Sequence, residues 1–475
     1  MIQIHLLRGE EAILPFLPRL QPLVQSAGST FIFNRPEVPL LWWKHFQGRD
    51  GSDFGVKRGR NFLGVKTRLE EILFVVAERE DGPCGLAAMV ASEVMLKANT
   101  PPLKLLSFCA DSVIVFYQDL LVDPRDRGTT IAALAGFLAD LAEKEGRTLF
   151  LGHIPKDSLN LPFLQAAIED RIRLGWSGSV TENRFRGGAY PWTVHKIASA
   201  IAAIRESLPP DDAARAGLEN LAARLDAQGP ALIGFAGTRI AFEKEIRALC
   251  ETHRQRPEAA DAVAQIEGCL EGAPIQYPYL PLPKTPEAYL ESLSSSRRYY
   301  FRRYLKKYGE AGADFEKIES RNITQAHVDE YLDLHMQRWG NDSVAVNTAT
   351  LAFHRELCME AARQGIFTLF FARHNGRRLV AHVCLDIGNR REYFFSGRTK
   401  DSEDLRAGKL MVMHTILDAI TSGFGIYDFG YGGDEYKADF TKTYRTALSL
   451  FLSKGAMPEL DRLFPKYECM RPIAG

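Results

Sequence analysis

An internal repeat is the feature that most constrains how this chain folds. Residues 73–90 and residues 369–385 each contain an apolar run, a D-G or N-G dipeptide, and a second apolar run. Asp or Asn followed by Gly readily adopts the positive φ angles of tight hairpin turns, so each segment is predicted to form a β-hairpin. Two such hairpins far apart in one chain indicate two related units.

The similarity continues after each hairpin. A Gly residue, Gly128 or Gly408, precedes a stretch with apolar residues at helical spacing, near 131–141 and 410–420. Each stretch ends before another Gly and a short apolar segment. Each half is therefore predicted to contain a hairpin, a helix and a further strand, which gives a mixed, mostly antiparallel sheet with flanking helices. A chance similarity between two α/β segments is the alternative.

The predicted fold class is α/β (α+β), with two tandem units and a helical insertion. The expected parts are an N-terminal half, the insertion with its linker, a C-terminal half and a tail, at residues 1–196, 197–276, 277–457 and 458–475. The insertion is rich in Ala, Glu and Arg, and helices are expected near 211–227 and 239–254.

Composition excludes several classes of protein. Lys plus Arg and Asp plus Glu both total 59, so no overall charge attracts the chain to nucleic acid or membrane. The seven cysteines form no C-x-x-C pair, which argues against a disulfide framework or a metal site. No apolar run approaches the roughly 20 residues of a membrane helix. A reducing, cytoplasmic location without a membrane span is expected.

A basic segment at residues 294–309 is the first candidate for ligand binding. Six of the eleven residues Arg297–Lys307 are basic and none is acidic. On a helix, Arg298 and Arg302 share one stripe, with Arg303 beside it. The segment is either a solvated helix surface or an anion site. Basic residues interleaved with aromatics also suit nucleic acid, which the neutral net charge disfavours.

The segment Y-L-D-L-H-M-Q-R-W-G-N, residues 331–341, predicts a second helix. Its spacing is expected to bury Leu332 and Trp339 and to turn His335 and Arg338 toward a cleft. The alternative is that Trp339 is a core residue and His335 a hydrogen-bonded structural one.

The turn Arg406-Ala407-Gly408-Lys409 precedes the second of the two predicted helices. A helix N-terminus exposes unpaired N–H groups and a partial positive charge, which suits a pyrophosphate. Gly lets a ligand approach the backbone closely.

The segment 427–440 combines the end of a strand at Asp428, a Gly-rich loop, and Tyr436-Lys437. Ligands of open α/β sheets gather beyond the carboxyl ends of strands. A carboxylate, a phenol and an ammonium there would orient an amine, protonate a leaving group and neutralise an oxyanion. A structural turn with an Asp–Lys contact is the alternative.

At these residues the chain resembles GNAT-superfamily acyltransferases of the CelD and FemAB-like branch, which have a BioF-like acetyltransferase domain and occur in bacterial envelope and polysaccharide loci. The motifs lie between residues 284 and 455 and are Y-L-x-S-L-S-x-x-x-R-x-x-F-R-R, L-H-x-x-R-W, A-G-x-L and D-F-G-x-G-x-x-x-Y-K. The resemblance implies a tandem GNAT-like fold. It also implies acyl transfer to an amine from acetyl-CoA or another acyl-CoA, or from aminoacyl-tRNA in Fem-like members.

Carried over by position, Ala407 and Gly408 match the family's helix-start turn, and Asp428, Tyr436 and Lys437 match its loop. In this reading Tyr436 protonates the departing thiolate. Asp428 or His382 accepts the proton of the amine, although His382 also fits a core position. Ala407 stands where the family often has Pro, and the turn lacks the full Q/R-x-x-G-x-G/A pattern.

The first half has L-G-H-I-P-K-D-S in place of the Asp–Gly–Tyr–Lys loop, so it is expected to be non-catalytic. The favoured function is transfer of an acyl group from acyl-CoA to a small-molecule or envelope-related amine, without a metal. The alternatives are a tRNA-dependent aminoacyltransferase and a non-catalytic scaffold in polysaccharide or envelope assembly.

Overall fold

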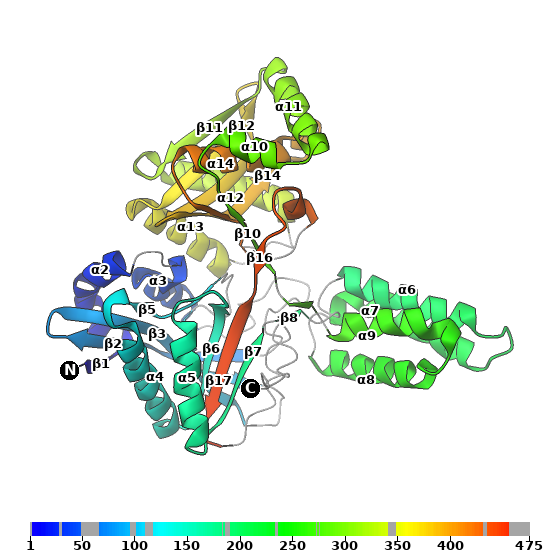
Figure 1. The fold of residues 1–475 in the computed structure, drawn as a ribbon, viewed down its shortest axis with the longest axis horizontal. Coiled ribbons are helices and arrows are strands. Elements are labelled where there is room, and N and C mark those ends of the chain that lie inside the picture. The colour runs from blue at the N-terminus through cyan, green and yellow to red at the C-terminus, as the bar shows by residue number, and fades with distance from the viewer. Residues whose placement is uncertain are drawn as a thin grey trace.

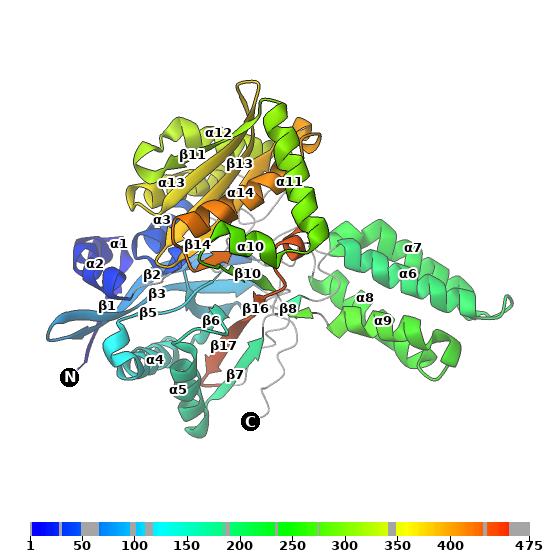
Figure 2. The same ribbon diagram turned by 45° about the horizontal axis from the view of Figure 1, so that its top comes forward.

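The computed structural model describes twelve segments of the chain, residues 2–27, 31–48, 66–95, 101–109, 117–182, 184–185, 191–232, 236–271, 273–274, 276–340, 348–430 and 435–455. The segments form two α/β lobes, one above the other in Figure 1, and a helical subdomain that projects to one side (Figure 1 and Figure 2). The predicted tail, 458–475, lies outside the described residues.

The first lobe is built on a mixed sheet with the strand order β1-β2-β3-β4-β6-β17-β7, and a short strand, β5 (Leu121–Val122), pairs with β3. In that order the seven strands are Gln3–Arg8, Lys66–Arg79, Gly82–Met95, Leu103–Phe108, Thr148–Pro155, Ala447–Ser453 and Ser177–Glu182. The helices of this lobe are α1 to α5, at Gly9–Ile13, Leu17–Ser26, Glu37–Phe46, Arg127–Lys144 and Leu161–Arg173.

The second lobe is built on a sheet with the order β11-β12-β13-β14-β15-β10-β16. In that order the strands are Asp314–Glu319, Phe367–His374, Arg377–Ile387, Arg390–Arg398, Ile426–Asp428, Tyr277–Pro281 and Tyr444–Arg445. Its helices are α10 to α14, at Pro286–Ser292, Ser295–Glu310, Gln325–Trp339, Thr348–Arg363 and Ala407–Thr421.

The two sheets have the same plan. In each, the fourth and fifth strands are parallel, β4 with β6 and β14 with β15, and the other neighbours along the order are antiparallel. The hairpins β2–β3 and β12–β13 occupy equivalent positions, as do helices α4 and α14. The predicted fold class, two tandem mixed α/β units with a helical insertion, is therefore confirmed.

The sixth strand of the first sheet comes from the other half of the chain. Strand β17 falls inside the residues expected to form the C-terminal half, yet it lies between β6 and β7 of the first sheet. Figure 1 shows it descending from the upper lobe into the lower one. It is held there by ladders on both edges and by the stacking of Phe451 on Phe150, with ring centroids 4.5 Å apart. The expected C-terminal unit of 277–457 is therefore corrected at its end.

Turn chemistry explains the second predicted hairpin and the helix ends. Asn375 and Gly376 have φ angles of 51° and 73°, the positive values of a tight hairpin turn. Gly146 and Gly423 follow α4 and α14 with φ angles of 61° and 83°, as left-handed helix C-caps require.

A shared apolar core joins the lobes. Helix α3 of the first lobe packs on α13 of the second, with the rings of Phe46 and Phe353 5.6 Å apart. Lys44 and Glu356 form an ion pair of 2.8 Å at the edge of this contact. The segment Trp42–Phe46 of α3, W-W-K-H-F in sequence, is thus part of the contact between the lobes.

The insertion has four helices where two were expected, namely α6 to α9, at Pro191–Ser207, Ala214–Leu232, Ala236–His253 and Ala260–Glu271. They enclose their own apolar core, which includes Ile201 and Ile266. A ribbon of β8 (Arg184–Phe185) and β9 (Ala273–Pro274) lies at their base. The helical segment starts at Pro191, before the expected boundary at 197.

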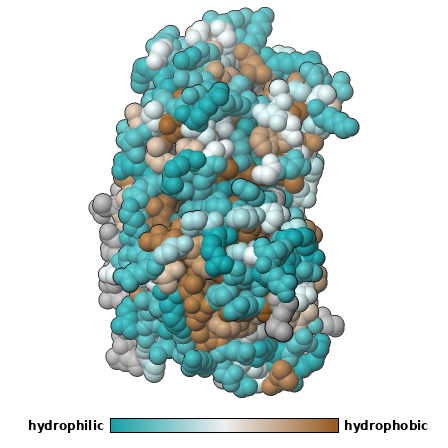
Figure 3. Space-filling model, turned by 90° about the vertical axis from the view of Figure 1, so that its left-hand side faces the viewer, coloured by the Kyte–Doolittle hydropathy of each residue, from teal (hydrophilic) through white to brown (hydrophobic). Residues whose placement is uncertain are grey.

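The side of the molecule that carries β1 and α2 is mostly hydrophilic, with apolar residues in a band over its lower half (Figure 3). None of the helices in the described segments has both the length and the apolarity needed to cross a bilayer.

Candidate functional site

The start of helix α14 presents free backbone donors. Arg406, just before the helix, has a φ angle of 54°, in the left-handed region that residues other than Gly seldom adopt. The amides of Lys409 and Leu410 bond back to the Arg406 carbonyl. Within the part of the chain that the structure describes, the amides of Ala407 and Gly408 have no acceptor. Such a helix start is suited to an anion.

The surroundings of this helix start are basic and open. A Cβ atom added at Gly408 would meet nothing nearer than Arg398, at 3.8 Å. Arg398 forms an ion pair of 3.0 Å with Glu403, and Lys409 is paired with Asp439. Two further cations lie nearby. Arg297 is 3.4 Å from Asp439. Burial raises the pKa of Tyr300, and the positive charge of the exposed Arg406 opposes that rise. Of these four basic groups, three are paired with Glu403 or Asp439, and Arg406 is exposed.

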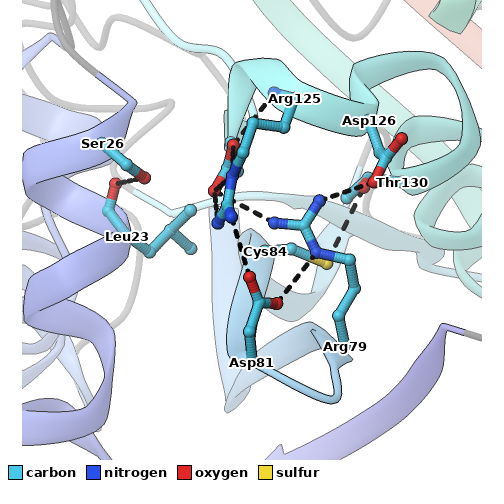
Figure 4. A network of polar contacts seen from close by, with 9 residues as sticks. Leu23, Ser26, Arg79, Asp81, Cys84, Arg125, Asp126 and Thr130 are labelled. Atoms are coloured by element: carbon cyan, nitrogen blue, oxygen red, sulfur yellow. Dashed lines mark hydrogen bonds and ion pairs between the residues drawn. The ribbon is translucent and has the colours of Figure 1, made fainter.

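The equivalent helix start in the first lobe is closed. The ring of Phe163 lies against Gly128, where an added Cβ would come within 2.9 Å of it. Asp123 accepts bonds from Arg79 and Arg125, and the bond from Arg125 is the main reason that the pKa of Asp123 falls to about 2. Figure 4 shows the two arginines converging on the carboxylates beside this helix. An anion has neither the space nor the free positive charge that α14 offers.

Beyond Glu392, one edge of β14 has no paired strand among the described residues, and it forms an open edge. Its parallel pairing with β15 ends at Glu392 and Asp428, while β14 continues to Arg398. The register with β13 shifts so that Phe394 is an extra residue, a β-bulge that bends the strand. The open edge therefore leads toward Arg398 and the α14 start.

Asp428 lies in a buried polar network between the lobes. Its side chain is 0% exposed and accepts bonds from Arg445 at 3.0 Å and from the Gly430 amide at 2.8 Å. The Tyr117 hydroxyl, from the first lobe, donates to it at 3.3 Å. The partner of Asp428 is thus an arginine on β16, and not the lysine of the Asp–Lys turn considered from the sequence.

Two further buried groups flank this network. Glu392, which pairs with Asp428 across β14 and β15, is bonded by Arg390 at 2.7 Å. Burial raises the pKa of Glu392 to about 6. The hydroxyl of Tyr277 is 3.3 Å from the ring of His153 in the first lobe. Sequence reasoning missed Tyr117, Glu392 and Arg445, because nothing local in the sequence indicates that they meet.

Tyr436 and Lys437 lie on the 3-10 helix Glu435–Asp439. Lys437 is buried, and the half-buried Tyr436 packs against the apolar core of the second lobe. Residues 431–434 of the Gly-rich loop lie outside the described segments. The 3-10 helix is brought to the α14 start by the Lys409–Asp439 pair.

His382 lies in a second buried cluster, on β13. Its ring is 4.8 Å from that of Tyr393, and burial, with the nearby Arg338, lowers its pKa well below the usual value. The imidazole is therefore neutral at physiological pH. Its Nδ1 atom is buried and has no partner among the described residues.

Helix α12 supplies the rest of this cluster. His335 is buried, and its Nδ1 atom is 2.8 Å from the Ser396 carbonyl oxygen. Arg338 donates to the Ser396 hydroxyl at 2.6 Å. The helix approaches β14 so closely that a Cβ on Gly397 would lie 2.2 Å from the backbone nitrogen of His335. Helix α12 thus brings His335 and Arg338 to the same residue of β14, Ser396, and the expectation that they face a substrate cleft stays a prediction.

The prediction that Trp339 is buried is wrong, since 43% of it is exposed. Trp339 is the last residue of α12, which Gly340 ends, whereas Leu332 lies inside the helix and is buried. The Arg338 guanidinium lies 4.5 Å from the centre of the Trp339 ring.

The basic helix α11 only partly meets the α14 start. Phe301 and Tyr308 form its buried face. Arg298 donates to the carbonyl oxygens of Glu291 and Leu293 and so terminates α10. Arg302 and Arg303 are exposed. Arg297, which was not singled out, is the arginine of this helix that lies near Asp439.

Residues 295–438 match the family model described as an acetyltransferase (GNAT) domain. The matched residues make up most of the second lobe, which is therefore similar to GNAT domains. The matched segment includes α11, the open edge of β14 and the α14 start. Among the described residues, no group of three or more His, Cys, Asp or Glu side chains is suited to a metal ion.

The chain is also similar to solved structures across most of its length. One is the C-terminal domain of a putative lysylphosphatidylglycerol synthetase from Agrobacterium fabrum, at 8% identity and a TM-score of 0.43, covering 95% of both chains. Another is FemX, at 11% and 0.42, covering 88% of this chain and 94% of that one. A third is a tandem GNAT protein from the clavulanic acid biosynthesis pathway, at 12% and 0.34, covering 96% and 100%. No curated protein sequence matches the chain.

Proposed function

We propose that the protein is an N-acyltransferase that uses an acyl-CoA as donor and an amine as acceptor, and that the second lobe is its catalytic half. The α14 start carries the proposal, because it combines two amides without an acceptor among the described residues with nearby basic side chains and an open approach over Gly408. These features suit the pyrophosphate of CoA.

The proposed path of the acyl group follows the open edge of β14. From the α14 start this edge leads past Arg398 to Ser396 and Tyr393. The chain contributes to the rate mainly by holding the thioester and the amine together, as expected for transfer between two bound substrates.

His382 and Tyr436 remain the proposed proton carriers. The neutral imidazole of His382 has a nitrogen without a partner among the described residues, so it can accept a proton from the amine. Tyr436 would protonate the departing thiolate. Asp428 is already bonded to Arg445 and fully buried, so we assign it a positioning role for the loop that follows.

The first lobe is proposed to be non-catalytic. Phe163 and the arginine–carboxylate cluster fill the place that corresponds to the α14 start. Its contribution would be structural, through β17, Tyr117 and helix α3.

The test is a Gly408→Asp variant. The open space at Gly408 accepts a side chain, and a carboxylate in the first turn of a helix does not destabilise it. The new carboxylate would repel a phosphate, so the affinity for CoA measured by calorimetry is expected to fall at least about tenfold, with an unchanged unfolding temperature. Gly217→Asp, on the exposed surface of α7 where an added Cβ meets nothing, is the matched control.

Release of free CoA thiol in the presence of amines would then establish the reaction. The proposal fails if acyl-CoAs of no chain length bind the wild type or stabilise it against heat. Binding of charged tRNA that weakens steeply with salt would instead identify an aminoacyltransferase. If substitution of Asp428, Tyr436 and Lys437 together left the cellular role intact, the protein would be a scaffold.

A further inference from the structure

Arg338 differs from most of the other partly or fully buried arginines of the second lobe. Arg378 is paired with Glu316 and Glu330, Arg391 with Asp386 and Asp418, and Arg445 with Asp428. Arg338 is only partly exposed, and none of the carboxylates in the described segments pairs with it. A half-buried guanidinium without an anion is costly unless something else binds it.

The Arg338 side chain is held in one orientation. Its Nη1 atom donates to the Ser396 hydroxyl at 2.6 Å, and the Tyr393 hydroxyl donates to the same oxygen at 2.6 Å. The guanidinium also lies on the exposed Trp339 ring, 4.5 Å from its centre. A guanidinium has five N–H donors, so most remain available after the Ser396 bond. The Ser396 oxygen accepts both bonds, so the hydrogen of this hydroxyl is also available for donation.

The position of Arg338 links it to the open edge of β14. Helix α12 packs on the face of the sheet at Gly397. Side chains alternate along a strand, so Ser396 points to the opposite face, where Tyr393 belongs to the core under α14. Strand β13 covers one edge of β14 there, so Arg338 reaches Ser396 around the edge that β15 has left.

This edge is also where the proposed acyl path ends. Ser396 is two residues from Arg398, roughly 7 Å along the strand, and Arg398 adjoins Gly408. The neighbouring histidines contribute no competing charge, because burial lowers the pKa values of His335 and His382. Within the described segments, Arg338 therefore supplies a positive charge without a paired carboxylate, beside the place where donor and acceptor would meet.

We propose that Arg338, fixed by Ser396 and Trp339, binds a carboxylate carried by one of the two substrates. The planar guanidinium fork matches a carboxylate with two parallel hydrogen bonds, and the Trp339 ring offers an apolar surface for the carbon chain that bears it. The inference rests on the proposed function and narrows its substrate class. The carboxylate belongs either to an amino acid acceptor or to a dicarboxylic acyl group, and the test distinguishes the two.

The test compares probes that differ only in the carboxylate. The donor arm measures binding of succinyl-CoA against butyryl-CoA. The acceptor arm measures binding of γ-aminobutyrate and lysine against 4-aminobutanamide and lysinamide, each to the protein saturated with CoA. In one arm the wild type is expected to prefer the carboxylate by about 10- to 100-fold. Arg338→Gln should abolish this preference, while Arg338→Lys should keep part of it.

Arg321→Gln, an exposed arginine on the 3-10 helix Ser320–Asn322, is the control and should keep the full preference. CoA itself is expected to bind Arg338→Gln as tightly as it binds the wild type. Absence of CoA binding to the wild type would overturn the proposed function. CoA binding without a carboxylate preference in either arm, or an equal loss of acid and amide binding in Arg338→Gln, would overturn the assignment of Arg338 alone.

Discussion

The Asp428–Arg445 ion pair is predicted to stabilise the contact between the lobes, and Asp428→Asn tests this. The variant keeps the shape of the side chain and removes its charge. In the wild type the carboxylate is fully buried, 3.0 Å from Arg445, and bonded by Tyr117 of the first lobe. Removing one partner of a buried pair costs about 3–5 kcal/mol. Arg445 retains Asp157 at 3.3 Å, which is partly solvated, so the lower end, about 3 kcal/mol, is expected.

The assay is urea unfolding of four proteins, the wild type, Asp428→Asn, Arg445→Met and the double variant. If the two side chains stabilise the fold through each other, the double variant loses less free energy of unfolding than the two single losses added together. A loss below about 1 kcal/mol for Asp428→Asn, or strict additivity in the cycle, would refute the reasoning.

Three further predictions concern stability. Gly397→Ala places a Cβ 2.2 Å from the backbone nitrogen of His335, so α12 must move. Chemical denaturation should show a loss of about 3 kcal/mol or more in the free energy of unfolding, whereas Gly309→Ala, on open surface, should show no loss. Burial lowers the pKa of His354 to about 3, while the unfolded side chain titrates near 6.5. The unfolded state therefore binds this proton first, and wild-type stability falls as the pH drops through this range. His354→Leu should reduce that slope by about 1.4 kcal/mol per pH unit, and an unchanged slope would exclude His354 as its source. Deletion of residues 447–475, which include β17, should leave β6 and β7 without their shared neighbour and unfold the first lobe. The amides of β6 should then exchange rapidly with solvent, and continued protection of these amides would contradict the sheet order.

Local patterns were sufficient for the repeated framework. Asn375-Gly376 has the backbone angles that its turn requires, and the helices after Gly128 and Gly408 follow from their periodicity. These features depend on residues close together in the sequence. The place of β17 in the first sheet does not depend on such local features, because β17 has the same apolar pattern whichever sheet it joins.

The candidate site was predictable only in part. The α14 start follows from motif spacing, and so does the common side of α12 that His335 and Arg338 share, from which both bond to Ser396. The partners of Asp428 do not, because Tyr117 and Arg445 reach it from another lobe and another strand. Arg298 was placed among the anion-binding residues by its helix stripe, yet the ends of α10 determine where its guanidinium lies. Trp339 was misplaced because periodicity does not reveal that Gly340 ends the helix at the rim of the lobe.

The place of β17 in the first sheet also sets the order in which a newly made chain can fold. The last strand of the first sheet to be encoded before the insertion ends at Glu182, and the missing strand ends at Ser453. At about 5–20 residues per second, a ribosome needs roughly 14–54 seconds to synthesise the intervening chain. During that time β6 and β7 are without the strand that separates them. Of the two lobes, the first is therefore the first to begin and the last to be completed, because its sheet has unpaired edges until Ser453 has been synthesised.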